Sequence, residues 1–238
     1  MTRISSTQIS ANYGSIVFPL LRTQAGETWD AYVRHEFVEK LRDGTLPRAA
    51  FLHYLRQDYL FLIHFARAWA LAVFKSGRLD EMRVAAAMID AHINEEMRLH
   101  IRTCAAEGME EATLAATTEE PENLAYTRFV IDTGMKGDLL DLLAALLPCV
   151  LGYGEIGSRL ATETDGPPPG HPYREWIESY ASSAYQAVCA DVGRLLENVT
   201  KRLIGPEPVT SPRWPDLLNT FTRAARLETD FWRMGLRE

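Results

Sequence analysis

Cysteine is scarce in this sequence, with only three among 238 residues. Cys104, Cys149 and Cys189 lie far apart, and none of them belongs to a Cys-x-x-Cys pair. An odd number of dispersed cysteines indicates neither a disulfide framework nor a zinc site. We therefore expect an intracellular, cytoplasmic protein whose thiols are free.

Basic stretches and long apolar runs are missing as well. The formal net charge is -7, which argues against a nucleic-acid or anionic-membrane partner. No segment reaches the roughly 18 uninterrupted apolar residues that a membrane span needs. The N-terminal stretch Met1–Ser6 is polar, so we expect no signal peptide and no membrane association.

Runs of alternating β-branched residues, which are typical of strands, are also absent. Only 15 Gly and 12 Pro interrupt a chain that is 47% hydrophobic, and apolar residues recur at helical spacing. We expect an all-α, single-domain helical bundle over residues 1–238, with residues 1–12 loose. The expected helices cover residues 47–75, 79–106, 124–134, 173–203 and 212–234. Two shorter helices are expected through 29–33 and 37–41, and a further helix contains Cys149. Residues 108–123 and 165–172 are expected to be connections.

The apolar helix around Cys149 has an unusual pattern. Pro148 lacks an N–H and crowds the carbonyl one turn earlier, so a kink is expected just before the thiol. Three glycines follow, which would let another backbone or a ligand approach: Gly152, Gly154 and Gly157. Cys149 and Tyr153 share one helical face and could form the wall of a pocket. The ordinary alternative is an inert, buried thiol.

Two acidic residues are each paired with an aromatic ring on one helical face. Asp58 lies among apolar neighbours and is followed at i+3 by Phe61, and Glu228 is followed at i+3 by Phe231. Either pair alone is common on a solvated helix. Together with Cys149 they suit a planar nitrogen heterocycle, which needs stacking faces and carboxyl groups that can donate or accept a proton.

Four motifs in order give the chain a resemblance to a known family. They are Arg56–Leu62 (RQDYLFL), Glu96–His100 (EMRLH), Leu146–Tyr153 (LLPCxxxY) and Glu228–Trp232 (ExxFW). With these motifs the chain resembles the TenA, or thiaminase II, family of aminopyrimidine aminohydrolases from about residue 28 to the C-terminus. The resemblance implies a haem oxygenase-like helical fold and a homotetramer, with no cofactor and no metal.

The resemblance also implies roles for individual residues. Cys149 matches the nucleophile, Glu228 the catalytic acid, and Asp58 the carboxylate that holds the pyrimidine's amino group and ring nitrogen. Around the ring and the thiol, the matching residues are Tyr126, Tyr153, Tyr180 and Phe231, with Tyr180 assigned to the catalytic set. Phe61 is also assigned to the substrate pocket, although some members carry tyrosine there.

The implied reaction converts 4-amino-5-aminomethyl-2-methylpyrimidine into its 5-hydroxymethyl analogue and ammonia. Cleavage of thiamin, with loss of its thiazole, is a second candidate, and the sequence does not choose between the two leaving groups. The implied partner is thus a small aminopyrimidine or thiamin.

Two other readings stay open at this stage. A helical di-metal oxidase is suggested by Glu96 and His100 at i and i+4, with Glu155 and Glu178, but the chain lacks the Glu-x-x-His pairs of such sites. A non-catalytic aminopyrimidine-binding or regulatory protein would need the ring walls and Asp58. Such a protein would have no need of a thiol and an acid together.

Overall fold

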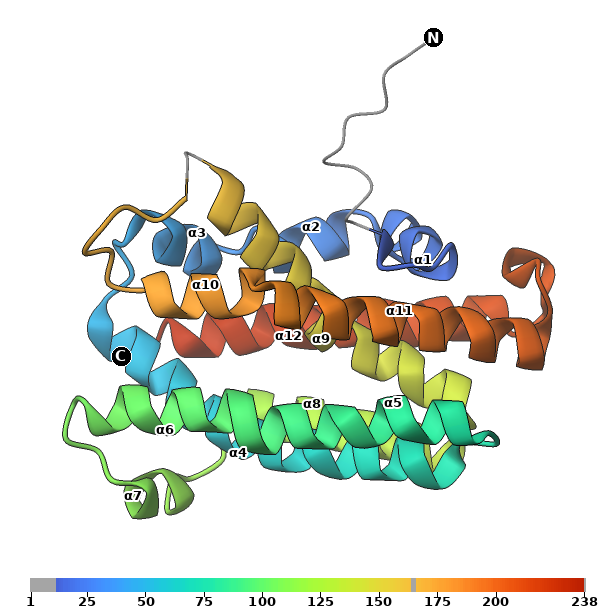
Figure 1. Cartoon of the computed structure of the whole chain (residues 1–238), viewed down its shortest axis with the longest axis horizontal. Helices are drawn as coiled ribbons and strands as arrows, with labels where there is room; N and C mark the ends of the chain where they lie inside the picture. The colour runs from blue at the N-terminus through green and yellow to red at the C-terminus, as the bar shows by residue number, and fades with distance from the viewer. Residues whose placement is uncertain (1–11, 164–165, 238) are drawn as a thin grey trace, which may run out of the picture.

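The computed structural model of the protein describes residues 12–163 and 166–237, so residues 1–11 of the expected loose N-terminus lie outside it (Figure 1). The described residues are helical and contain no strand, which confirms the all-α prediction. The helices are α1 (Val17–Ala25), α2 (Glu27–Val33), α3 (Glu36–Asp43), α4 (Arg48–Lys75), α5 (Leu79–Asp90), α6 (Met97–Ala105), α7 (Glu111–Ala115), α8 (Pro121–Lys136), α9 (Leu139–Thr162), α10 (Arg174–Ala181), α11 (Ser183–Ile204) and α12 (Trp214–Gly235).

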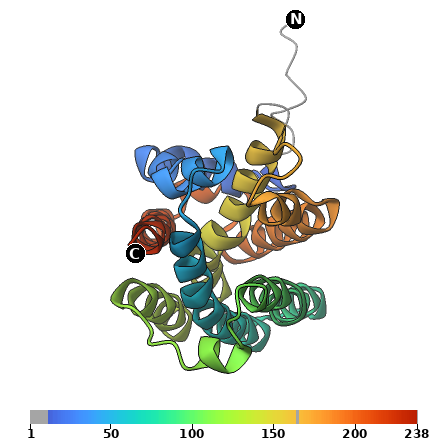
Figure 2. The same cartoon turned by 90° about the vertical axis from the view of Figure 1, so that its left-hand side faces the viewer.

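Helix α9 is the centre of the bundle. It packs against α2, α4, α8, α10, α11 and α12, and Figure 2, in which many of the helices are seen nearly end-on, shows the other helices arranged around it. Asp138 and Asp141 form a capping box that fixes its first turn. By length and composition α9 could span a membrane, with a mean hydropathy of 1.7, but 89% of its most apolar window is buried inside the protein. Its apolar character is therefore that of a core helix.

Glycines on α9 allow two other segments to approach it closely, as the sequence suggests. A Cβ added at Gly152 would lie 2.4 Å from the Tyr32 ring, and one added at Gly157 would lie 2.6 Å from the Tyr180 backbone carbonyl carbon. The Tyr32 hydroxyl donates a hydrogen bond of 3.0 Å to the Pro148 carbonyl. Pro148 lies inside α9 without ending it. The small residues therefore bring α2 and α10 against the segment that carries Cys149.

Two helix boundaries differ from the sequence prediction. The expected helix 173–203 is broken at Ser182, whose extended backbone ends α10 and whose hydroxyl accepts a hydrogen bond from the Tyr185 N–H to cap α11. The chain before Trp29 forms α1 and α2 rather than one helix, because Gly26 adopts a positive φ of 52°.

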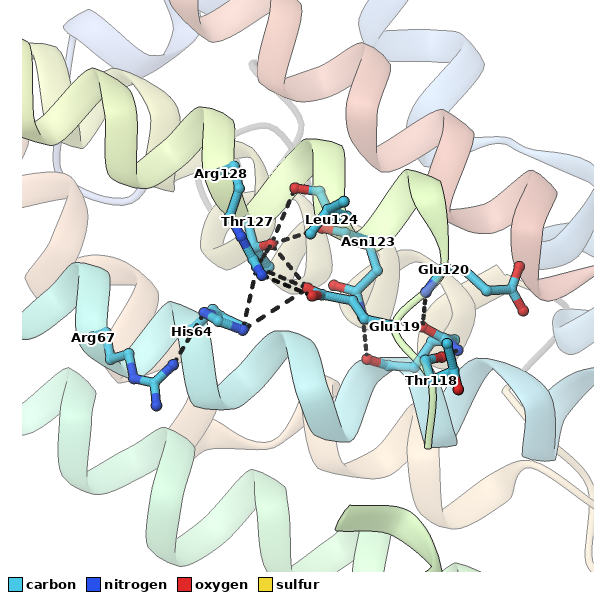
Figure 3. Close-up of polar contacts among 10 residues, drawn as sticks. His64, Arg67, Thr118, Glu119, Glu120, Asn123, Leu124, Thr127 and Arg128 are labelled. Atoms are coloured by element: carbon cyan, nitrogen blue, oxygen red, sulfur yellow. Dashed lines mark hydrogen bonds and ion pairs between the residues drawn. The ribbon is translucent and has the colours of Figure 1, made fainter. Parts of the chain in front are cut away.

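The expected connection 108–123 is partly helical, since it contains α7 and the first turn of α8. Gln57 of α4 fixes this segment: its side-chain amide donates to the Thr118 carbonyl (2.9 Å) and accepts from the Glu120 N–H (3.1 Å). The Asn123 amide donates to the Gln57 carbonyl at 2.8 Å. In Figure 3, Glu119 lies beside these residues and pairs with Arg128. This polar contact sets where α8 begins and hence how it lies on α4.

Replacing Gly157 by alanine is expected to destabilise the protein by about 1–3 kcal/mol, because the added methyl group overlaps the α10 backbone. Urea unfolding of the variant and the wild type gives this difference. Gly77→Ala is a suitable control, since a Cβ there meets nothing closer than 3.7 Å. Equal stability of Gly157→Ala and wild type would contradict a close contact between α9 and α10.

Candidate active site

Glu228 of α12 is a buried carboxyl group, with 2% of the residue exposed. The Tyr126 hydroxyl of α8 donates to its Oε1 at 2.8 Å. Burial raises the pKa of Glu228 to about 8, aided by the negative charges of Asp58 and Glu96, while hydrogen bonds with Tyr126 and Cys149 oppose the shift. Glu228 is therefore largely protonated at neutral pH and can give up its proton near that pH.

The Cys149 thiol lies beside this carboxyl group. Cys149 is 8% exposed, and burial raises the pKa of its thiol well above the ordinary value, with Glu228 and Glu96 adding to the shift. The resting thiol is neutral for this reason. A nucleophilic sulfur at this position needs a group that accepts its proton when a ligand is bound.

Asp58 on α4 is paired with a buried histidine. Its Oδ2 lies 2.5 Å from His100 Nε2 and accepts a hydrogen bond of 3.2 Å from the Tyr54 hydroxyl. Burial raises the pKa of Asp58, as its apolar sequence neighbours suggest. Burial by itself would lower the pKa of His100, but the hydrogen bond and charge of Asp58 raise it. The two groups share a proton and are both buried, with exposed fractions of 3% for Asp58 and 0% for His100.

Aromatic rings connect these polar groups. Phe61 lies 5.0 Å from Tyr126 and 5.5 Å from Phe231 between ring centroids, and Tyr153 lies 5.0 Å from Tyr180. The structure brings all eight residues singled out from the sequence into one connected cluster on α4, α8, α9, α10 and α12. Their catalytic and binding roles remain predictions.

Sequence reasoning missed Tyr54, which joins the two halves of the cluster. Its hydroxyl donates to Asp58 and lies 3.5 Å from the Tyr153 hydroxyl, while Trp176 Nε1 donates to it at 3.4 Å. Tyr54 is four residues before Asp58 and so shares its helical face, which is a signal the sequence did contain. The pairing of His100 with Asp58 joins residues 42 positions apart, and no local pattern reveals it.

The four residues behind the di-metal reading do not converge. Glu96 contacts His92 Nδ1 at 2.8 Å, whereas His100 faces Asp58. Glu155 pairs with an arginine of α1, and Glu178 pairs with one on its own helix. Across residues 12–163 and 166–237, no group of three or more His, Cys, Asp or Glu side chains could hold a metal ion.

Comparison with solved structures defines the class of protein. A TenA family transcription regulator from Silicibacter sp. TM1040 has a TM-score of 0.90 at 53% identity, over 94% of this chain and 98% of that one. The TenA homologue protein from P. horikoshii OT3 has a TM-score of 0.81 at 25% identity, over 93% and 98%. The fold is thus the all-α haem oxygenase-like fold, as expected.

The chain belongs to the TENA/THI-4/PQQC family, whose model matches residues 22–238. An aminopyrimidine aminohydrolase from Halalkalibacterium halodurans is 34% identical over 221 residues, which cover 92% of this chain and 94% of that protein. The resemblance found in the sequence is confirmed. The protein is an enzyme of the hydrolase class.

Glu228 is expected to make stability depend on pH. Between its unfolded value of 4.5 and its folded value of about 8, the native carboxyl keeps a proton that the unfolded chain has lost. Stability therefore falls as pH rises through this window, by about 1.4 kcal/mol per pH unit for one proton. Glu228→Gln removes this contribution. Between pH 5 and pH 7.5 the free energy of unfolding of the variant should therefore fall by about 2–3 kcal/mol less than that of the wild type.

Urea unfolding at the two pH values measures this difference. Glu207→Gln, at an exposed position, is the control and should follow the wild type. Parallel pH profiles for Glu228→Gln and wild type would mean that Glu228 is already ionised at neutral pH.

Proposed function

We propose that the protein hydrolyses 4-amino-5-aminomethyl-2-methylpyrimidine to the 5-hydroxymethyl product and ammonia, as a salvage reaction for the thiamin pyrimidine. The observation that carries this proposal is the buried contact between a neutral thiol, Cys149, and a carboxyl group, Glu228, whose pKa lies near 8. A pair of this kind can move a proton between sulfur and a ring nitrogen. The names of the relatives support the substrate class.

Glu228 moves the proton in each half of the proposed reaction. The Cys149 sulfur adds to the pyrimidine carbon beside a ring nitrogen while Glu228 gives its proton to that nitrogen, and the resulting carboxylate takes up the proton of the thiol. The electron pair of the dearomatised ring then expels ammonia from the exocyclic methylene. Water adds to this methylene and passes one proton to the departing ammonia, the thiolate leaves the ring, and the ring nitrogen returns its proton through Glu228 to sulfur. The net change is water consumed and ammonia released.

Asp58 and the rings hold the heterocycle in this proposal. The carboxyl group of Asp58 shares a proton with His100, so it can both accept from the pyrimidine's amino group and donate to a ring nitrogen. Phe61 and Phe231 supply apolar faces close to both acids. The ring edge of Phe61 lacks the hydroxyl that tyrosine would bring, so the pyrimidine is held there by packing. Tyr153 and Tyr180 complete the enclosure.

Thiamin cleavage shares the pyrimidine site and is the second candidate reaction. A regulatory role is favoured by one observation, the description of the similar Silicibacter protein as a transcription regulator. A net charge of -7 is unfavourable for contact with DNA. A regulator also gains nothing from a thiol held against a carboxyl group. The hydrolase proposal accounts for both groups.

The proposal takes residues 1–238 as one domain of this family, active in the cytoplasm as a homotetramer. Support for the domain comes from the family match over residues 22–238. Support for assembly comes from large apolar side chains that are exposed on the single chain, among them Phe74 at 83% and Met135 at 66%. The three free cysteines are consistent with a reducing compartment.

Ammonia release from 4-amino-5-aminomethyl-2-methylpyrimidine tests the reaction. Cys149→Ala is expected to abolish turnover, because no other thiol contacts Glu228, and Glu228→Gln should lower kcat by at least about a hundredfold. Cys104→Ala is the matched control, since Cys104 is equally free and buried but lies on α6 outside the cluster. Treatment with a chelator should leave the rate unchanged.

Turnover that survives Cys149→Ala would overturn the thiol mechanism. Absence of turnover by the wild type with both this substrate and thiamin would overturn the hydrolase assignment for these pyrimidines.

A further inference from the structure

A cavity of about 520 Å³ shares Tyr180 with the cluster that contains Cys149 and Glu228. Its walls come from α5, α6, α10, α11 and the π-helical turn Ala91–Glu96 between α5 and α6. The volume lies in the usual range of about 300–1,000 Å³ for small-molecule sites. Departure of ammonia alone would require far less space.

Two tyrosines connect this cavity with the reacting groups. Tyr180 lines the cavity and its ring lies 5.0 Å from that of Tyr153 between centroids. Tyr185 also lines it, and the Tyr185 hydroxyl donates to the Val150 carbonyl at 3.2 Å, one residue from Cys149. A group attached to a pyrimidine that lies against Cys149 can therefore extend into the cavity.

The cavity is lined by more negative than positive charge. Its lining residues include one guanidinium, that of Arg102, and four carboxylates, those of Glu95, Glu96, Glu175 and Glu178. Two of these carboxylates have arginine partners, Glu175 with Arg102 at 2.9 Å and Glu178 with Arg174 at 2.7 Å, so the unbalanced negative charge lies on Glu95 and Glu96. An anionic, partly enclosed space attracts cations and repels anions.

Glu96 is the carboxylate that lies deepest in this cavity. Its side chain is 14% exposed, and its carboxylate accepts from Tyr180 and from His92. A carboxylate offers about four lone-pair sites, so two remain for a ligand. Burial opposes ionisation of Glu96, but hydrogen bonds and nearby histidines hold its pKa below the ordinary value. His92, 2% exposed, also lines the cavity, and its Nε2 has no partner within the described part of the chain.

The negative charge of Glu96 acts electrostatically on the reacting groups. It is among the charges that raise the pKa of both Cys149 and Glu228. Glu96 accepts a hydrogen bond from Tyr180, whose ring lies 5.0 Å from that of Tyr153, so a cation beside Glu96 would lie next to the tyrosines of the cluster. The π-helical turn places the carboxylate there, and such turns occur frequently at functional sites.

We propose that Glu96 binds the positive charge of the substrate's leaving group, and that this cavity selects pyrimidines whose 5-methylene carries a cation. The inference rests on the proposed function. Both candidate substrates qualify, because the aminomethyl group is an ammonium ion at neutral pH and thiamin carries a thiazolium ring. The hydroxymethyl product is neutral, so Glu96 holds the substrate more tightly than the product.

Binding measurements with three pyrimidines test this selection. In a Cys149→Ala background, calorimetry gives the Kd of the aminomethyl compound, of thiamin and of the hydroxymethyl compound at pH 7. Glu96→Gln should weaken the two cations by about ten- to a hundredfold, the range of one charge-assisted hydrogen bond. It should change the Kd of the neutral compound less than threefold. Glu96→Asp keeps the charge and should retain part of the preference.

Two further variants remove one negative charge elsewhere. Glu95→Gln changes an exposed neighbour of Glu96 and should weaken cation binding much less. Glu207→Gln changes an exposed residue outside the cavity and should leave all three affinities unchanged.

The outcomes separate this inference from the proposed function. Equal weakening of cationic and neutral ligands by Glu96→Gln, or none at all, would overturn the cation site while hydrolysis by the wild type stands. Selective loss of cation binding in a protein that never releases ammonia would keep the cation site and overturn the hydrolase proposal. A wild type that binds none of the three compounds would overturn both.

Discussion

The rest of the site depends on three acidic side chains, Asp58, Glu96 and Glu228, that have little exposure and pair with no arginine or lysine in the described part of the chain. Burial of an ionised carboxylate costs several kcal/mol unless hydrogen bonds or charges offset it. Glu96 is ionised and lies between a histidine and a tyrosine hydroxyl. Asp58 shares a proton with His100. Glu228 has a phenol and a thiol as its partners. Three acids in one cluster therefore differ in their protonation. Such differences give neighbouring acids separate chemical roles.

The packing around α9 helps to bury Asp58 and Glu228. Gly152 and Gly157 let Tyr32 and the α10 backbone lie against the helix, and larger side chains there would push both away. Helix α10 carries Trp176 and Tyr180, whose side chains donate to Tyr54 and Glu96. The burial that raises the pKa values of Asp58 and Glu228 therefore depends on close packing at small residues of α9.

Helical periodicity was enough to predict the fold class and the central, buried helix around Cys149. The acid and aromatic pairs at i+3 likewise predicted that Asp58 and Glu228 belong to a site, because that spacing fixes a shared face. The break at Ser182 was missed since apolar residues keep their spacing across it, and only the cap of α11 marks the boundary. The pairing of Asp58 with His100 depends on how α4 packs on α6, which no local pattern encodes. The π-helical turn that carries Glu96 was missed for a similar reason.

The resting site and the proposed substrate are electrostatically linked. Burial is the main cause of the high pKa of the Cys149 thiol, and Glu96, the carboxylate proposed to bind the cation, adds to it, so the thiol is neutral and little prone to oxidation when no cation is bound. A cation beside Glu96 would offset part of that negative field and lower the cost of forming the thiolate. Under the proposed function the thiol would then become reactive when a substrate with a charged leaving group is present. The neutral product would restore the unreactive state, because it brings no charge to the cavity.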